Sequence, residues 1–151
     1  MSKAALISIL IGALVAGAAL AHEGATGVIA ERMKAMENMG RELKAMIGMV
    51  DGEGPLDRAA LVRHAEAFHE DCHRVEAMFP PGSIDHHSFV RSSIWEEPEA
   101  FRIEAQRLQD ATENLAAMVE RSAVAAELRA AVEDVRTSCT SCHDKFRIPE
   151  D

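Results

Sequence analysis

The sequence predicts an all-α protein, an antiparallel up-down-up-down four-helix bundle. Apolar residues recur at alternating spacings of four and three along four segments, which is typical of helices packed around a shared core. No segment shows the strict alternation that predicts a β-strand. The chain of 151 residues, 48% of them hydrophobic, has the size of one domain with a substantial core. An up-down-up-down bundle is the most economical architecture for four such helices.

The first 21 residues have the features of a secretory signal peptide. Lys3 precedes an apolar run from Ala4 to Leu20, and Ala19-Leu20-Ala21 forms a small-x-small cleavage site. The run is short for a membrane span, so we expect cleavage and no stable membrane insertion afterwards. The mature domain would then occupy residues 22–151, and in a bacterium it would reside in the periplasm.

The charge balance is acidic. Sixteen basic and 25 acidic residues give a formal net charge of −9, and no basic cluster is present. Such a chain is unsuited to binding nucleic acid. An acidic surface suits partners with a positive face, although it also simply favours solubility.

The first helix is predicted from about Gly27 to Val50. Glycines and a proline within 51–55 end it. Counting in steps of four and three gives an inward stripe composed of Ile29, Met33, Met36, Gly40, Leu43, Ile47 and Val50.

The second helix is predicted to begin at the N-cap Asp57 and to end before Pro80. Cys72 falls on its inward stripe, where a lone cysteine behaves as a small hydrophobe rather than as a reactive thiol. The stripe is Leu61, Ala65, Phe68, Cys72, Val75 and Phe79. The following residues, 80–94, lack periodicity and predict the one long connection.

The third and fourth helices follow from the same count. The third begins around Trp95–Pro98, and after Val119 its count meets polar residues, so we expect a turn within 120–124 although no glycine or proline marks it. Its stripe is Phe101, Ala105, Leu108, Thr112, Leu115 and Val119. The stripe of the fourth helix is Leu128, Val132, Val135, Cys139, Cys142 and Phe146.

The fourth helix carries Cys139-Thr140-Ser141-Cys142-His143, the attachment pattern of a c-type haem. Residues three apart lie on one helix face, so both sulfurs can form thioethers with one porphyrin, and His143 can bind the iron. Because both cysteines lie on the core stripe, we expect one haem c, held covalently inside the bundle near one end. A thiol oxidoreductase pair or part of a zinc site is the alternative, but no βαβ context or further ligands accompany the motif.

The methionines of the first helix are the candidates for a second axial ligand of the iron, opposite His143. The stripe count places Met33 and Met36 inward, and Gly40, one turn beyond Met36, would leave space for a flat ring. A thioether sulfur is a known partner of histidine in haem proteins. Methionines also fill gaps in ordinary cores, so the residues alone leave both possibilities open.

The segment Cys139–Arg147 resembles the C-x-x-C-H-x-x-[YF]-R ending of class II cytochromes c, the cytochrome c′ family. Weaker similarities in the same order lie at residues 31–36, 54–57 and 94–95, so the resemblance covers essentially the whole mature chain. It implies a four-helix bundle with one haem. Arg32 matches the arginine on the propionate side of the haem, and Met33 lies in the haem-contact stretch.

The resemblance also implies a role for Met36. High-spin members carry a bulky non-coordinating residue at this position and bind small gases, whereas low-spin members of the c-556 type place a ligating methionine there. We therefore expect a periplasmic electron-transfer cytochrome with iron between His143 and Met36. The alternative is a five-coordinate cytochrome c′ that binds NO or CO.

We do not expect an enzyme, because no acid–base residue accompanies Met36 on the first helix. The expected partners are redox proteins, and the chain itself is either a monomer or a homodimer. Two histidine pairs remain without an assigned role: His69 with His73, and His86 with His87.

Overall fold

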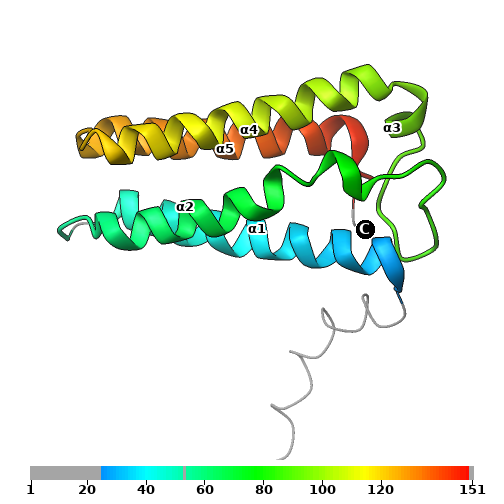
Figure 1. Ribbon diagram of the computed structural model, residues 1–151, viewed down its shortest axis with the longest axis horizontal. Coiled ribbons are helices and arrows are strands. Elements are labelled where there is room, and N and C mark those ends of the chain that lie inside the picture. Colours follow the sequence, from blue (N-terminus) through cyan, green and yellow to red (C-terminus); the bar gives the residue numbers. More distant parts are fainter. Residues whose placement is uncertain (1–24, 53, 150–151) are drawn as a thin grey trace, which may run out of the picture.

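Four long helices form two layers in the computed structural model, which describes residues 25–52 and 54–149 (Figure 1). The predicted signal peptide, residues 1–21, lies outside the described residues. The long helices are α1 (Gly27–Asp51), α2 (Arg58–Cys72), α4 (Pro98–Glu120) and α5 (Ala125–Phe146). Two short helices, η2 (Glu76–Met78) and α3 (Ser93–Glu96), lie between α2 and α4.

The direction of the chain reverses from each long helix to the next. Figure 1 shows α1 and α2 in one layer and α4 and α5 in the other, with α3 and the end of α5 at the same end as the start of α1. The antiparallel up-down-up-down bundle is confirmed. Within the described part of the chain, no helix is long and apolar enough to cross a membrane.

The inward stripes predicted for α2, α4 and α5 form the core. Phe68 and Leu61 of α2, Leu115 of α4 and Leu128 and Val135 of α5 have no exposed surface. Each lies at a position that the count of four and three assigned to the inside. Burying a side chain of this size contributes about 1.5–3 kcal/mol, so these stripes supply much of the stability of the bundle.

The predicted stripe of α1 was wrong in its centre. The fully buried residues are Arg32, Ala35, Met39, Met46 and Val50, whereas Gly40 is exposed and a Cβ there would meet nothing within 4 Å. From Arg32 to Met46 the buried positions lie one residue before the counted ones, because the count admits apolar residues only and so passes over Arg32, which its hydrogen bonds to Ser83 and Ser88 hold in the interior. Gly40 therefore makes no room for a ligand.

Helix α2 ends at Cys72, earlier than predicted. The chain continues in tighter turns, in which Val75 N–H donates to the Cys72 carbonyl at 3.2 Å and Met78 N–H to the Val75 carbonyl at 3.1 Å. These bonds close over three residues, as in a 3₁₀ helix. Val75 nevertheless stays buried and Phe79 half-buried, so the inward direction of the stripe is preserved.

The turn predicted within residues 120–124 joins α4 to α5. Ser122 adopts φ 57°, in the left-handed region that favours glycine. Its N–H donates to the Val119 carbonyl at 3.1 Å, and Ala123 N–H donates to the Met118 carbonyl at 3.0 Å. This pair of bonds is a Schellman motif with serine where glycine is usual.

The long connection, residues 80–92, leads from η2 to α3 and lies against the end of α5. Arg91 N–H donates to the Phe146 carbonyl at 2.9 Å, and Ile148 N–H donates to the Phe89 carbonyl at 2.8 Å. Val90 and Arg147 form an isolated antiparallel bridge between them. The C-terminal end of the bundle is therefore closed by a loop that is hydrogen-bonded to it.

Candidate functional site

A cavity of about 370 Å³ lies at this closed end, between α1, the long connection and the end of α5. Its volume is within the range of small-molecule and cofactor sites. Its walls are mainly apolar and aromatic, with a few charged groups and imidazoles. The lining residues include Arg32, Met33, Met36, Val75, Phe79, His87, Ile94, Phe101, Cys142, His143, Phe146 and Arg147.

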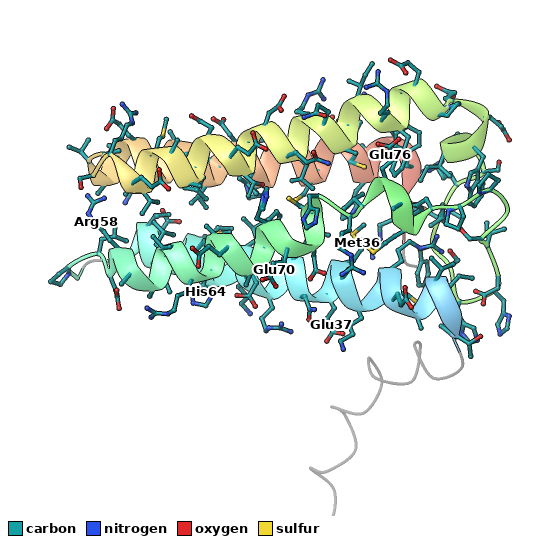
Figure 2. The ribbon with its side chains drawn as sticks, viewed as in Figure 1. Met36, Glu37, Arg58, His64, Glu70 and Glu76 are labelled. Carbon is teal, nitrogen blue, oxygen red and sulfur yellow. The ribbon has the colours of Figure 1, made fainter. Side chains whose placement is uncertain are left out.

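Five of the six predicted site residues line this cavity. Arg32, Met33 and Met36 come from α1, and Cys142 and His143 come from α5. Figure 2 shows Met36 in the half of the bundle that carries α3 and the end of α5. The structure thus brings the candidate ligands of the first and last helices to one space.

Cys139 is the sixth predicted residue and is not part of this lining. It lies one turn before Cys142, half-buried against the hydrophobic core. Burial raises the pKa of both thiols to about 11. A redox-active thiol needs a lowered pKa, because the thiolate is the nucleophile, so this environment disfavours a thiol oxidoreductase.

Three phenylalanines form a continuous aromatic wall. Phe101 contacts Phe79 edge-to-face with ring centroids 5.0 Å apart, and Phe146 in the same manner at 5.5 Å. Edge-to-face pairs are favourable arrangements of aromatic rings and hold each ring in a defined orientation. The wall therefore offers a firm apolar surface to a flat ligand.

Arg32 is a buried cation at the edge of the cavity. Its guanidinium donates to the Ser88 hydroxyl at 2.8 Å and to the Ser83 carbonyl at 3.1 Å, and it lies 4.5 Å from the centre of the Phe79 ring. Desolvation lowers the pKa of Arg32, and the charge of Asp85 opposes that shift. Among the described residues, however, no carboxylate forms an ion pair with it. An anionic group bound in the cavity would supply the negative charge that Arg32 lacks as a partner.

His143 is an exposed residue on the cavity wall. The pKa of its imidazole is lowered, chiefly by desolvation and further by the charge of Arg147. The neutral ring is therefore favoured at neutral pH, and a neutral ring nitrogen is the form that binds a metal ion.

Three residues in or near the cavity were missed by sequence reasoning. Glu37 lines the cavity, although no acid–base residue was expected beside Met36 on the first helix. His87, which had no assigned role, lines the cavity, with its ring 3.8 Å from that of His86. Glu104 is buried between α4 and α5. The burial of Glu104 could have been predicted, because it lies three residues after Phe101 and four before Leu108, on the same inward face of the helix.

The other histidine pair lies on α2. The rings of His69 and His73 stack with centroids 5.5 Å apart, and His69 Nδ1 is 3.9 Å from the Cys72 sulfur. Within the described residues, no group of three or more His, Cys, Asp or Glu side chains is arranged to hold a metal ion.

The residues present fit a haem c. A haem is a flat apolar ring with an iron at its centre and two carboxylates at its edge, and in haem c its vinyl groups become thioethers to cysteine. The cavity offers an aromatic wall, Cys142 and the neutral imidazole of His143 on one side, and Met36 on another. The buried Arg32, which lacks a carboxylate partner, suits a propionate.

Comparison with known proteins agrees with this fit. The profile of the family described as Cytochrome C' matches residues 27–147. A cytochrome c′ of Rhodopseudomonas palustris is 29% identical over 142 residues, which are 93% of this chain and 94% of the relative. A cytochrome c-556 of Agrobacterium fabrum is 26% identical over 146 residues, 97% of this chain and 95% of the relative.

The fold has similar solved structures as well. A ferrous variant of cytochrome c prime from Alcaligenes xylosoxidans with bound NO superposes with a TM-score of 0.75 at 28% identity. The superposition covers 82% of this chain and 94% of that one. Sequence, fold and cavity lead to the same assignment: the chain belongs to the cytochrome c′ family.

Proposed function

We propose that the protein carries one covalently attached haem c in this cavity and binds a diatomic gas, NO or CO, at its iron. The observation that carries the haem assignment is the meeting of Cys142 and His143 of α5 with Met36 of α1 at one cavity. When bound, haem supplies an iron that takes up a small gas or exchanges one electron.

The residues of the chain have separate tasks in this proposal. Cys139 and Cys142 form the two thioethers, and His143 provides an imidazole nitrogen to the iron. Arg32 neutralises a propionate, and Met33 contacts the ring. The phenylalanine wall excludes water from the apolar side of the cavity.

Gas binding is the better supported of two functions. The relatives include proteins named cytochrome c′, and a similar structure has NO bound. These similarities favour the gas-binding alternative over the electron carrier that the sequence predicted. Electron transfer with Met36 as the second axial ligand stays as the second candidate, because Met36 lines the cavity and relatives named cytochrome c-556 are also similar.

The two functions are separated by replacing Met36 with leucine, which keeps the volume but removes the sulfur. If gas binding is correct, the reduced wild-type protein binds CO readily, and M36L leaves its high-spin absorption spectrum unchanged. If Met36 ligates the iron, the wild-type protein resists CO, and M36L opens it to the gas. M46L is the matched control, since Met46 is a fully buried core residue of the same helix.

The setting of the protein is part of the proposal. The leader-like residues 1–21 support export and a periplasmic location. We propose no catalysed reaction, but binding or redox exchange with partner proteins, by a monomer or homodimer. A wild-type protein that retained no haem after acid–acetone extraction would contradict both functions.

A further inference from the structure

One carboxylate is enclosed in the interface between α4 and α5. The side chain of Glu104 is only 1% exposed, and it is the buried acidic residue among those that the structure describes. Removing a carboxylate from water costs several kcal/mol, so such a group persists only where it is well paired.

The partners of Glu104 come from both helices. Arg107 of α4 donates from Nη1 to the two carboxylate oxygens at 2.9 and 2.8 Å. Lys145 of α5 donates from Nζ to Oε1, and the same Arg107 nitrogen donates to the Ser141 hydroxyl at 3.2 Å. Desolvation alone would raise the pKa of Glu104, but hydrogen bonds from Lys145 and Ser141 and the two positive charges outweigh it and lower that pKa.

The α5 partners lie on either side of Cys142 and His143, two of the three residues proposed to hold the haem. Ser141 and Lys145 are four residues apart and share one helix face, and Cys142 and His143 lie between them in sequence. In an α-helix each residue is rotated about 100° from the last. Holding the Ser141–Lys145 face against α4 therefore fixes the direction in which Cys142 and His143 point.

We propose that Glu104 is a positioning residue for haem attachment: its carboxylate holds Ser141 and Lys145 against α4, which directs Cys142 and His143 to the cavity. Its enclosed negative charge also lowers the reduction potential of the haem held there. This inference rests on the proposed haem binding and adds to it a residue that touches neither the cavity nor the iron.

Glutamine is the informative replacement at this position. Glu104→Gln keeps the shape of the side chain but removes its charge, and the new amide nitrogen would place a donor against the donors of Arg107 and Lys145. These two cations, 50% and 53% exposed, are free to turn toward solvent. We therefore expect E104Q to release the end of α5 from α4.

The experiment uses the full chain with covalently attached haem. In E104Q the equilibrium between oxidised and reduced haem should move roughly tenfold toward the reduced form, because removing a nearby negative charge favours the state that holds one more electron. For a one-electron couple this is a rise of about 59 mV in the midpoint potential. Amide hydrogen exchange near the end of α5 should become faster in the same variant.

The matched control is E99Q on the same helix. Glu99 also pairs with an arginine three residues on, Arg102, but its side chain is 69% exposed. E99Q should change neither the potential nor the exchange. If E104Q and E99Q behave alike, the proposal is overturned.

A second variant, K145M, separates the effect of the α4–α5 contact from the effect of charge on the potential. It changes an exposed residue and leaves the buried Glu104 in place. K145M should speed exchange at the end of α5 as E104Q does, yet lower the midpoint potential, because it removes a positive charge. A potential that rises in K145M, or an unchanged exchange rate, would contradict the inference. A wild-type protein without covalent haem would instead refute the proposed function and leave the α4–α5 contact to be tested by exchange alone.

Discussion

Among the described residues, Arg32 and Glu104 are the two charged side chains that are buried. Both lie at the end of the bundle that contains the cavity. Arg32 holds the long connection to α1, and Glu104 holds α5 to α4. Removing one partner of a buried charge is costly, because the groups that were paired with it stay buried without a partner. The value of the two buried charges here is that each one fixes the geometry of a different wall of the cavity.

Replacing Arg32 with methionine is expected to destabilise the protein by roughly 2 kcal/mol, because Ser83 and Ser88 lose a charged hydrogen-bond donor. Urea unfolding measures the difference from the wild type. K34M, a neighbouring exposed position, should lie within about 0.5 kcal/mol of the wild type. Equal losses in the two variants would mean that the buried contacts of Arg32 are not what stabilises the loop.

The lowered pKa of Glu104 makes its contribution to stability dependent on pH. A carboxyl group with a depressed pKa in the folded state stabilises the protein above its ordinary pKa of about 4.3, and this stability is lost as the pH falls through the folded value. The wild type should therefore be more stable than E104Q at pH 7, and the difference should shrink below about pH 4.3. A difference in unfolding free energy that stayed constant down to pH 2 would contradict this.

At the scale of the helices, α2, α4 and α5 follow the predicted stripes because their buried positions are almost all apolar. The stripe of α1 was misplaced because a count of apolar residues chose Met33 over the charged Arg32, which is buried. The early end of α2 could not be predicted either, since a 3₁₀ turn keeps Val75 and Phe79 near the inward face that the count gave them.

The candidate site could be located in advance from the Cys142–His143 motif and Met36. Glu104 was overlooked because acidic residues usually face solvent.

The turn between α4 and α5 gives a prediction at the same scale. Ser122 occupies the left-handed position of a Schellman motif, where glycine avoids the clash of a Cβ with the backbone. Ser122→Gly should raise the free energy of unfolding by about 0.5–1 kcal/mol, measured by thermal or urea unfolding. Ser122→Val, with a β-branched side chain, should lower the free energy of unfolding. If valine raised it instead, the backbone at position 122 would not be strained.

For the molecule as a whole, the three cysteines should differ in their importance. The double variant Cys139→Ala with Cys142→Ala should lose covalent haem, seen as loss of the haem band on a denaturing gel, and its Tm should fall by roughly 10 °C. Cys72→Ala should keep the haem, because Cys72 is fully enclosed in the core and takes no part in the cavity.

The cost of Cys72→Ala should be limited to about 1 kcal/mol, the expected effect of removing a small buried group. If Cys72→Ala abolished haem attachment while the double variant retained it, the roles assigned to the three sulfur atoms would be reversed.

The walls of the cavity come from the first and the last of the four long helices. Helix α1 supplies Met36 and α5 supplies His143, and the loop is joined by backbone bonds to Phe146 of α5 and to Ile148 just after it. During synthesis the first helix therefore emerges long before its counterpart exists. The cavity is completed only when translation reaches the last turn of α5, so a chain terminated before that turn contains most of the bundle but an incomplete cavity.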